Sequence, residues 1–242
     1  MYKLLEFNED NFAESLKNDA TPPSLIRAKN QFGYLFGYLS RVGTRTIIVE
    51  EEYISNDYLQ DYAYYYSTCF VKYKKYCRRL HFFSYKFDQV AFERLITHGS
   101  IEFSFKETYV GFIVVKPIPH SVIGFTALKT YDSTIGSSLV ERDFWGTRQY
   151  HANLFGIPLT VKSLAFQEQD AVVSACATTA IWSMLHGAMR NADHTIVLKS
   201  QAEITADGGH DSDGNRIFPN HGLELPQISD SIAETGLQCE IK

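Results

Sequence analysis

The sequence lacks the signatures of several large protein classes. None of its four cysteines forms a C-x-x-C pair, so neither a zinc ribbon nor a thioredoxin-like motif is indicated. It has no run of about eighteen apolar residues, so no membrane-spanning helix is predicted. The first ten residues, MYKLLEFNED, contain no apolar signal-peptide segment. We therefore expect a cytoplasmic protein with free thiols and no membrane partner.

The sequence also lacks a surplus of positive charge. Its formal net charge is −5, which disfavours a general nucleic-acid-binding protein. One basic cluster stands against this background, consisting of Lys72, Lys74, Lys75, Arg78 and Arg79. The cluster can be interpreted as a phosphate-binding patch or as a solvated face among acidic neighbours. The second interpretation is the simpler one, so a nucleic-acid partner is not expected.

What is present is the composition of an ordinary globular protein. Of the 242 residues, 45% are hydrophobic and 21% charged, which is ample for a sizeable core. The hydrophobic pattern predicts an α+β fold, with a β-rich N-terminal portion followed by a helical portion after about residue 169. We expect a mixed α/β domain over residues 1–149 and a second domain over residues 150–242.

Individual elements follow from local patterns of apolar and turn-forming residues. Strands are predicted at 45–54, 78–85, 109–119 and 122–131, with one or two more at 150–169. Helices are predicted at 24–40, 57–70, 87–99 with a glycine stop, from 174 onward, and at about 225–235.

The most informative stretch is QEQDAVVSACATTAIWSMLH, residues 167–186. If Ser174 caps a helix, Cys176 lies in its first turn. The core-facing stripe of that helix would then consist of Ile181, Met184, Leu185 and Ala188. Cys176 lies about 140° from Ile181 around the helix axis. It shares a different stripe with small residues, namely Ala180, Ser183 and Gly187, where chain or substrate can come close.

This position suits a nucleophile. The free N–H groups at a helix N-terminus favour an anion, and the thiolate is the nucleophilic form of cysteine. A preceding glutamine amide could stabilise the oxyanion that forms when the thiolate attacks a carbonyl. The same pattern also fits a small buried cysteine, which is a common core residue.

The segment resembles the nucleophile region of papain-like cysteine peptidases, in particular the C39-like bacterial branch. There a glutamine precedes the cysteine by about six residues, and the cysteine opens a long helix. Gln169 stands seven residues before Cys176 and fits that pattern better than Gln167, which stands nine before it. Ala177 replaces the glycine or tryptophan that usually follows the nucleophile. A wider similarity, over residues 45–242, is to uncharacterised bacterial proteins that carry this segment.

The resemblance implies a cysteine peptidase or related amide hydrolase with Cys176 and Gln169 as catalytic residues. It also implies a peptide or protein substrate and a catalytic histidine farther along the chain. His186 lies about 15 Å from Cys176 along the same helix and is too far away. Of the other downstream histidines, His194 lies just past the end of the helix, and neither His210 nor His221 is followed by the apolar strand that normally carries the base.

We therefore expect the histidine half of the catalytic unit to lie outside these 242 residues, so that this chain alone does not hydrolyse peptides. The alternative is a non-catalytic peptidase-like scaffold that binds a partner protein through the tyrosine-rich helix at 58–66 and the strand-rich N-terminal half.

No metal or other cofactor is predicted. The segment GHDSDGNR, residues 209–216, resembles a calcium-binding loop at first sight. If Gly214 takes the sixth position of an EF-hand, the first position is Gly209 and the twelfth is Asn220. Neither supplies the carboxylate that the ion requires, so a turn rich in aspartate and glycine is the better interpretation.

Overall fold

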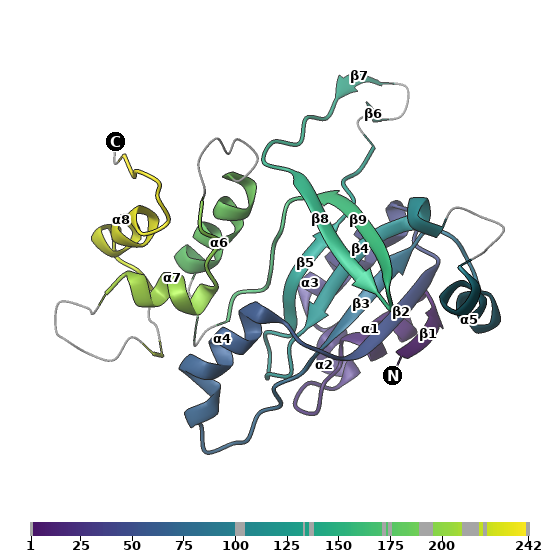
Figure 1. Ribbon diagram of the computed structural model, residues 1–242, viewed down its shortest axis with the longest axis horizontal. Coiled ribbons are helices and arrows are strands. Elements are labelled where there is room, and N and C mark those ends of the chain that lie inside the picture. The colour runs from purple at the N-terminus through teal and green to yellow at the C-terminus, as the bar shows by residue number, and fades with distance from the viewer. Residues whose placement is uncertain are drawn as a thin grey trace.

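The computed structural model describes residues 2–99, 105–132, 134–135, 138–170, 173, 176–188, 196–209, 218–219 and 222–240 (Figure 1). Its centre is a five-stranded sheet in which every neighbouring pair is antiparallel and the strand order is that of the chain. The strands are β1 (Tyr2–Glu6), β2 (Thr46–Tyr53), β3 (Cys77–Phe83), β4 (Tyr109–Val115) and β5 (Ile123–Leu128).

Helices are inserted between these strands and also follow them. Between β1 and β2 lie α1 (Glu9–Leu16), α2 (Pro23–Arg27) and α3 (Asn30–Arg41). The next connections contain α4 (Asn56–Tyr64) with the 3-10 turn η1 (Tyr66–Thr68), then α5 (Gln89–His98) with η2 (Phe105–Thr108). The C-terminal part contributes α6 (Cys176–Ala188), α7 (Gln201–Asp207) and α8 (Leu225–Ala233).

Two antiparallel pairs complete the described structure. The strands β6 (Thr134–Ile135) and β7 (Ser138–Glu141) form a short pair that projects from the body of the molecule (Figure 1). The longer hairpin of β8 (Arg148–Leu154) and β9 (Ile157–Ser163) packs against β4 and β5.

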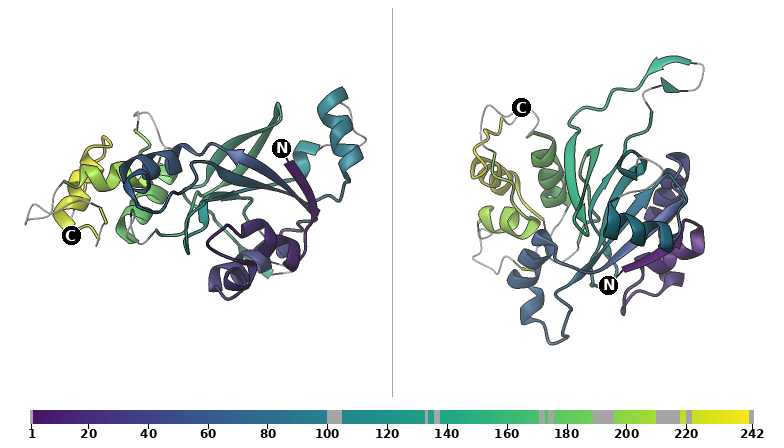
Figure 2. Two further views of the ribbon diagram at one scale, coloured as in Figure 1. Left: turned by 90° about the horizontal axis from the view of Figure 1, so that it is seen from below. Right: turned by 45° about the vertical axis from the view of Figure 1, so that its right-hand side comes forward.

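The two faces of the five-stranded sheet bury different cores, because side chains alternate along each strand. Leu80 and Phe82 of β3 belong to one core, which α1 to α3 cover. Cys77 and Phe83 belong to the other, where the β8–β9 hairpin, α4 and α6 pack. Figure 2 shows α1–α3 gathered below the sheet in its left view. The sheet thus separates an all-helical layer from a mixed layer.

The mixed layer joins the C-terminal helices to the sheet. The Trp182 ring of α6 meets Phe125 of β5 edge-on, with ring centroids 5.2 Å apart. Tyr150 of β8 meets the same phenylalanine at 5.7 Å. Buried residues of the sheet, the hairpin and α6 to α8 therefore form one continuous core cluster.

The predicted mixture of helices and strands is correct, but the predicted order, β-rich first and helical afterwards, is wrong. Helices alternate with strands throughout the first half, because each antiparallel neighbour up to β4 is reached through a helical connection. The proposed boundary between residues 149 and 150 falls within β8. The division into two domains stays a prediction.

Several element boundaries also differ from the predicted ones. The predicted helix at 24–40 is two helices, because the chain breaks between Arg27 and Asn30. The helix predicted to run to residue 70 ends at Tyr64 and is capped by Ser55. By contrast, α5 ends as predicted at Gly99, whose φ of 68° is the left-handed conformation that glycine adopts without strain. The part of the chain that the structure describes contains no helix long and apolar enough to cross a membrane.

Candidate functional site

Cys176 is the first residue of α6, and its side chain is exposed. Its Sγ lies 2.9 Å from Oε1 of Gln169, to which the thiol donates a hydrogen bond. The structure therefore brings together the two residues proposed from the sequence. Ser174, the predicted N-cap, lies outside the described residues.

The buried face of α6 differs from the predicted stripe. Ile181 and Leu185 are buried as expected, but Met184 is 44% exposed. Trp182 and His186 are buried in its place. The larger ring side chains, which pack on Phe125 and Tyr150, rotate the buried face toward the hairpin. Cys176 lies away from this face, as predicted.

The segment that carries Gln169 is fixed along the edge of β5. The backbones of Phe166 and Thr126 exchange two hydrogen bonds of 2.9 and 3.1 Å, and the Glu168 N–H donates to the Ile123 carbonyl at 2.8 Å. The Ser121 hydroxyl donates to the Gln169 carbonyl at 2.8 Å. Residues 166–169 therefore extend the sheet like a short sixth strand and hold Gln169 in a defined place.

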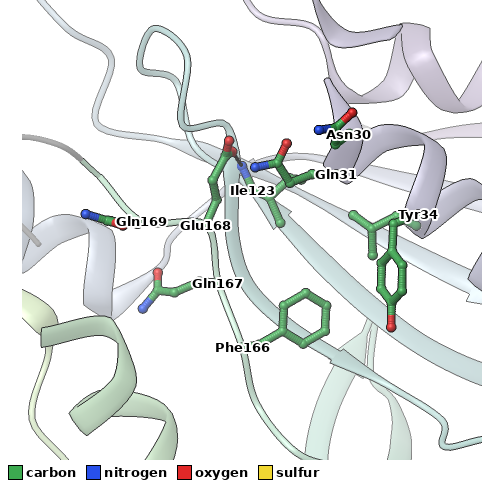
Figure 3. A pocket seen from close by; sticks show the side chains of 9 residues that line it. Asn30, Gln31, Tyr34, Ile123, Phe166, Gln167, Glu168 and Gln169 are labelled. Atoms are coloured by element: carbon green, nitrogen blue, oxygen red, sulfur yellow. Dashed lines mark hydrogen bonds between the residues drawn. The ribbon is translucent and has the colours of Figure 1, made fainter. Parts of the chain in front are cut away.

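Side chains alternate along this segment. Figure 3 shows Phe166 directed toward the cavity beside α3, while Gln167 and Gln169 are directed away from α3. The Glu168 carboxylate forms an ion pair with Lys29 of 2.9 Å. Gln167 is buried, and its Nε2 has no hydrogen-bond partner among the described residues. Gln169, and not Gln167, is therefore the glutamine that contacts the thiol.

Small residues on α6 let the preceding chain approach the helix closely. The Ser183 hydroxyl donates to the Ala165 carbonyl at 2.6 Å. A Cβ atom on Gly187 would lie 3.2 Å from the Gly146 carbonyl oxygen, so little more than a hydrogen fits there. The predicted stripe of small residues is therefore the surface on which α6 docks against the chain that carries Gln169.

Buried hydrogen bonds fix the other side of α6 against α7. The hydroxyls of Thr178 and Thr205 lie 3.3 Å apart, and the Thr205 hydroxyl donates to the Val173 carbonyl at 3.1 Å. The Ser231 hydroxyl of α8 donates to the Ile204 carbonyl at 2.8 Å. The three helices therefore form one hydrogen-bonded unit behind Cys176.

No histidine contacts Cys176 in the described part of the chain, where Gln169 is its hydrogen-bond partner. His186 is buried beside Trp182, with ring centroids 4.2 Å apart, and burial together with Arg148 lowers its pKa to about 3. The imidazole is therefore neutral at pH 7. Its position ten residues along α6 from Cys176 also places it out of reach of the thiol. His194, His210 and His221, and most of the predicted aspartate-rich turn at 209–216, lie outside the described residues.

A cavity of about 590 Å³ adjoins the thiol-bearing site (Figure 3). Its apolar wall consists of Tyr34 and Leu35 of α3, Ile123 of β5 and Phe166. Gln169 is also among the lining residues, while its side chain is directed away from α3.

A buried group of charged residues was not predicted from the sequence. Burial raises the pKa of Asp57 to about 6 and that of Asp61 to about 7, while Lys116 acts in the opposite direction on both. The Lys116 ammonium is buried, without a hydrogen-bond partner among the described residues. Tyr66 donates a short hydrogen bond to the buried carboxylate of Asp170, the residue that follows Gln169.

The only sequence signal for this group was the pair of aspartates one turn apart among the tyrosines of α4. Lys116 directly follows the continuously buried strand β4, where a lysine is expected to extend to solvent. No local pattern in the sequence therefore predicted its burial.

The two other sequence features are the basic cluster and the tyrosine-rich helix, and the members of each lie in different surroundings. In the basic cluster, Lys74 pairs with Asp19 at 2.7 Å, while Arg79 is buried and pairs with Glu50 at 2.8 Å. Arg78 instead reaches the Lys17 carbonyl beside α1, on the opposite face of the sheet, so the cluster is not one patch. In the tyrosine-rich segment at 58–66, Tyr58 and Tyr66 are buried in the core, while Tyr64 is 45% exposed. Whether this segment binds a partner stays a prediction.

No family model, curated protein or solved structure matches this chain.

Proposed function

We propose that Cys176 is the nucleophile of a papain-like thiol hydrolase of the C39-like type, acting on an amide or ester bond. Gln169 is the residue that stabilises the oxyanion. The observation that carries the proposal is the 2.9 Å contact between Sγ and Oε1 at an exposed first residue of a helix.

The chemistry follows from the two residues. The thiolate attacks the carbonyl carbon, the carbonyl oxygen takes up the negative charge, and departure of the leaving group gives a thioester on Sγ. A half-turn of the Gln169 amide about its last bond brings Nε2, a donor, to the place of Oε1. The amide and the free N–H groups at the start of α6 then both face the oxyanion.

The way in which the backbone of Gln169 is held supports this role. An oxyanion donor accelerates a reaction only if it is already in place when the charge develops. Backbone pairing with β5 and the hydrogen bond from Ser121 hold the Gln169 backbone, while the side chain stays exposed next to the thiol.

The substrate we propose is a peptide or protein. The cavity beside α3 has an apolar wall and shares Gln169 with the thiol site, so it suits an apolar substrate side chain close to the scissile bond. The general base comes from a group other than the histidines described in the structure, and we assign it to no residue.

A substrate that needs little help from a base tests the proposal, and p-nitrophenyl acetate is suitable. The expected result is a burst of about one equivalent of p-nitrophenolate per chain, because the ester acylates Cys176. Cys176→Ser removes the burst. Gln169→Ala slows it by about 100-fold, the usual effect of losing an oxyanion donor.

The matched control is Cys239→Ser, because Cys239 is the other exposed cysteine. This variant keeps the full burst. A burst that survives Cys176→Ser, or that is as fast in Gln169→Ala as in the unmodified chain, contradicts the proposal.

The second candidate is a non-catalytic peptidase-like scaffold that binds a partner protein. It is favoured by one observation: within the described residues, no imidazole lies within hydrogen-bond reach of Cys176. A folded chain with no burst, whose Cys176 reacts no faster than Cys239, would support it.

A further inference from the structure

A second cavity, of about 420 Å³, lies on the same face of the sheet but toward the opposite end of α6 from Cys176. It is bounded by the β2–α4 junction, by β3 to β5, by β8 and by residues 198–200. His186 of α6 lines it. Ten residues of helix, or about 15 Å, separate His186 from Cys176. The cavity is therefore independent of the thiol site, and the inference drawn from it does not rest on the proposed function.

Aromatic rings make up the apolar part of the cavity wall. Rings from four different strands line it: Tyr53, Phe112, Phe125 and Tyr150. Phe125 meets Phe112 at 5.4 Å and Tyr150 at 5.7 Å between ring centroids, so three of the rings form one continuous surface. Such surfaces favour planar ligands, because aromatic rings gain most from offset or edge-on contact.

The charged groups in the wall are mostly cationic. Arg79, Arg148 and Lys199 line the cavity, against the single carboxyl of Asp57. The acids that pair with Arg79 and Lys199, Glu50 and Asp207, are not part of the wall. Burial raises the pKa of Asp57 to about 6, which reduces the opposing charge only at pH values near 6 and below.

Both arginines lie over aromatic rings, and Arg79 also donates hydrogen bonds to Glu50 and to the Asn153 carbonyl. The Arg79 guanidinium lies 4.1 Å from the centroid of Tyr53, and that of Arg148 lies 4.8 Å from the centroid of Tyr150. A guanidinium fixed against a ring presents its N–H donors in a set direction, the geometry that binds carboxylate or phosphate oxygens.

One buried polar atom in the wall lacks a partner in the part of the chain that the structure describes. His186 is 5% exposed, and its Nδ1 has no hydrogen-bond partner among the described residues. A buried polar group without a partner is costly, and one explanation is a ligand that supplies the missing partner.

We propose that this cavity binds a small planar molecule that carries one anionic group, a carboxylate or a phosphate. The anion lies against Arg148 and Arg79, the planar body packs on the rings of Phe112, Phe125 and Tyr150, and a polar atom of the ligand pairs with Nδ1 of His186. Its volume is within the usual range for small-molecule sites, roughly 300–1,000 Å³.

The chain contains a built-in reporter for this site. Trp182 is buried and packs against His186 with ring centroids 4.2 Å apart, and it meets Phe125 at 5.2 Å. The second tryptophan of the chain, Trp145, is 79% exposed. In a Trp145→Phe background, the fluorescence of the protein reports on Trp182 alone.

The experiment is a fluorescence titration of the Trp145→Phe chain with three probes. Phenyl phosphate has both the ring and the anion, inorganic phosphate has only the anion, and benzyl alcohol has only the ring. The expected result is a saturable change with phenyl phosphate, at least ten-fold tighter than with either partial probe, and competition by inorganic phosphate. Equal responses to phenyl phosphate and benzyl alcohol, or no response to any probe, would overturn the proposal.

Arginine variants locate the binding. Arg148→Met weakens phenyl phosphate binding by at least ten-fold. Arg142→Met is the matched control, because Arg142 also lies over a tyrosine ring, that of Tyr131, which is not part of the cavity wall. Binding that is equal in both variants would overturn the assignment. If Arg148→Met does not fold, the three-probe comparison in the parent chain decides the question by itself.

Discussion

The two faces of the central sheet differ in what they bury. The face under α1–α3 is an apolar core that includes Phe12, Leu39, Leu80 and Phe82. The opposite face buries groups that titrate, among them Asp57, Asp61, His81 and His186, together with the Lys116 ammonium. Cys176 and the second cavity lie on this polar side, while the cavity beside α3 borders the apolar side. The comparison teaches that one face of the sheet is packed with apolar side chains, while the other also holds buried charged and polar groups.

The largest effect is expected on the apolar face, from Phe82→Ala. Phe82 is fully buried and meets Phe12 of α1 at 6.0 Å between ring centroids. Removing a buried phenylalanine ring costs about 3–5 kcal/mol, because the transfer energy is lost and a cavity remains. Urea denaturation measures the loss. A loss below about 1 kcal/mol would show that this face is not the stabilising one.

The polar face should make stability depend on pH. Burial raises the pKa of Asp61 to about 7 and that of Asp57 to about 6, both from an ordinary value of 3.8. The folded chain therefore binds more protons than the unfolded chain between about pH 4 and pH 7, and the free energy of unfolding falls as pH rises through this range. Asp61→Asn should flatten the fall by about 3 kcal/mol, measured by urea denaturation at pH 4.5 and 7.5.

The matched control for this pH effect is Asp10→Asn on α1. Asp10 pairs with Arg27 at an exposed position on the apolar side, and such pairs contribute little. The pH dependence of this variant should equal that of the unmodified chain. If the free energy of unfolding of Asp61→Asn falls with pH as steeply as that of the unmodified chain, the buried Asp61 carboxyl is not the source of the pH dependence.

The smallest effects are expected at two helix N-caps, one at the start of α1 and one at the start of α7. Removing either cap should have about the same effect on stability. Asn8 accepts a hydrogen bond from the Asn11 N–H at 2.8 Å at the start of α1. Ser200 accepts one from the Glu203 N–H at 3.2 Å at the start of α7. Replacing either by alanine should cost about 1 kcal/mol. A cost at Ser200 that is several times the cost at Asn8 would show that α7 lacks support from tertiary packing.

The sequence predicts the parts of the fold that depend on local pattern. The apolar strand at 109–119, its neighbour at 122–131 and the helix ending at Gly99 are all present, because alternation and a glycine stop act over a few residues. Of the three N-terminal helices, α1 was missed, and α2 and α3 were predicted as a single helix at 24–40. With eight residues in α1 and five in α2, both are too short for a clear periodicity.

The site was only partly predictable. Helix phase placed Cys176 off the core, and the choice of Gln169 followed from the resemblance. The burial of Asp61 and Lys116 could not be predicted, because they meet only when α4 folds over the end of β4. The same holds for Met184, whose exposure follows from the packing of Trp182 and His186 on the hairpin.

The most direct test of the cysteine site is a competition between two cysteines of the same chain. Cys176 and Cys239 are both exposed, but only Cys176 opens a helix and contacts a glutamine amide. The measurement is the ratio of their rates of alkylation by limiting iodoacetamide at neutral pH, read by peptide mass spectrometry. The account predicts that Cys176 reacts about ten-fold faster or more, and that denaturation abolishes the difference. Equal rates in the folded protein would contradict it.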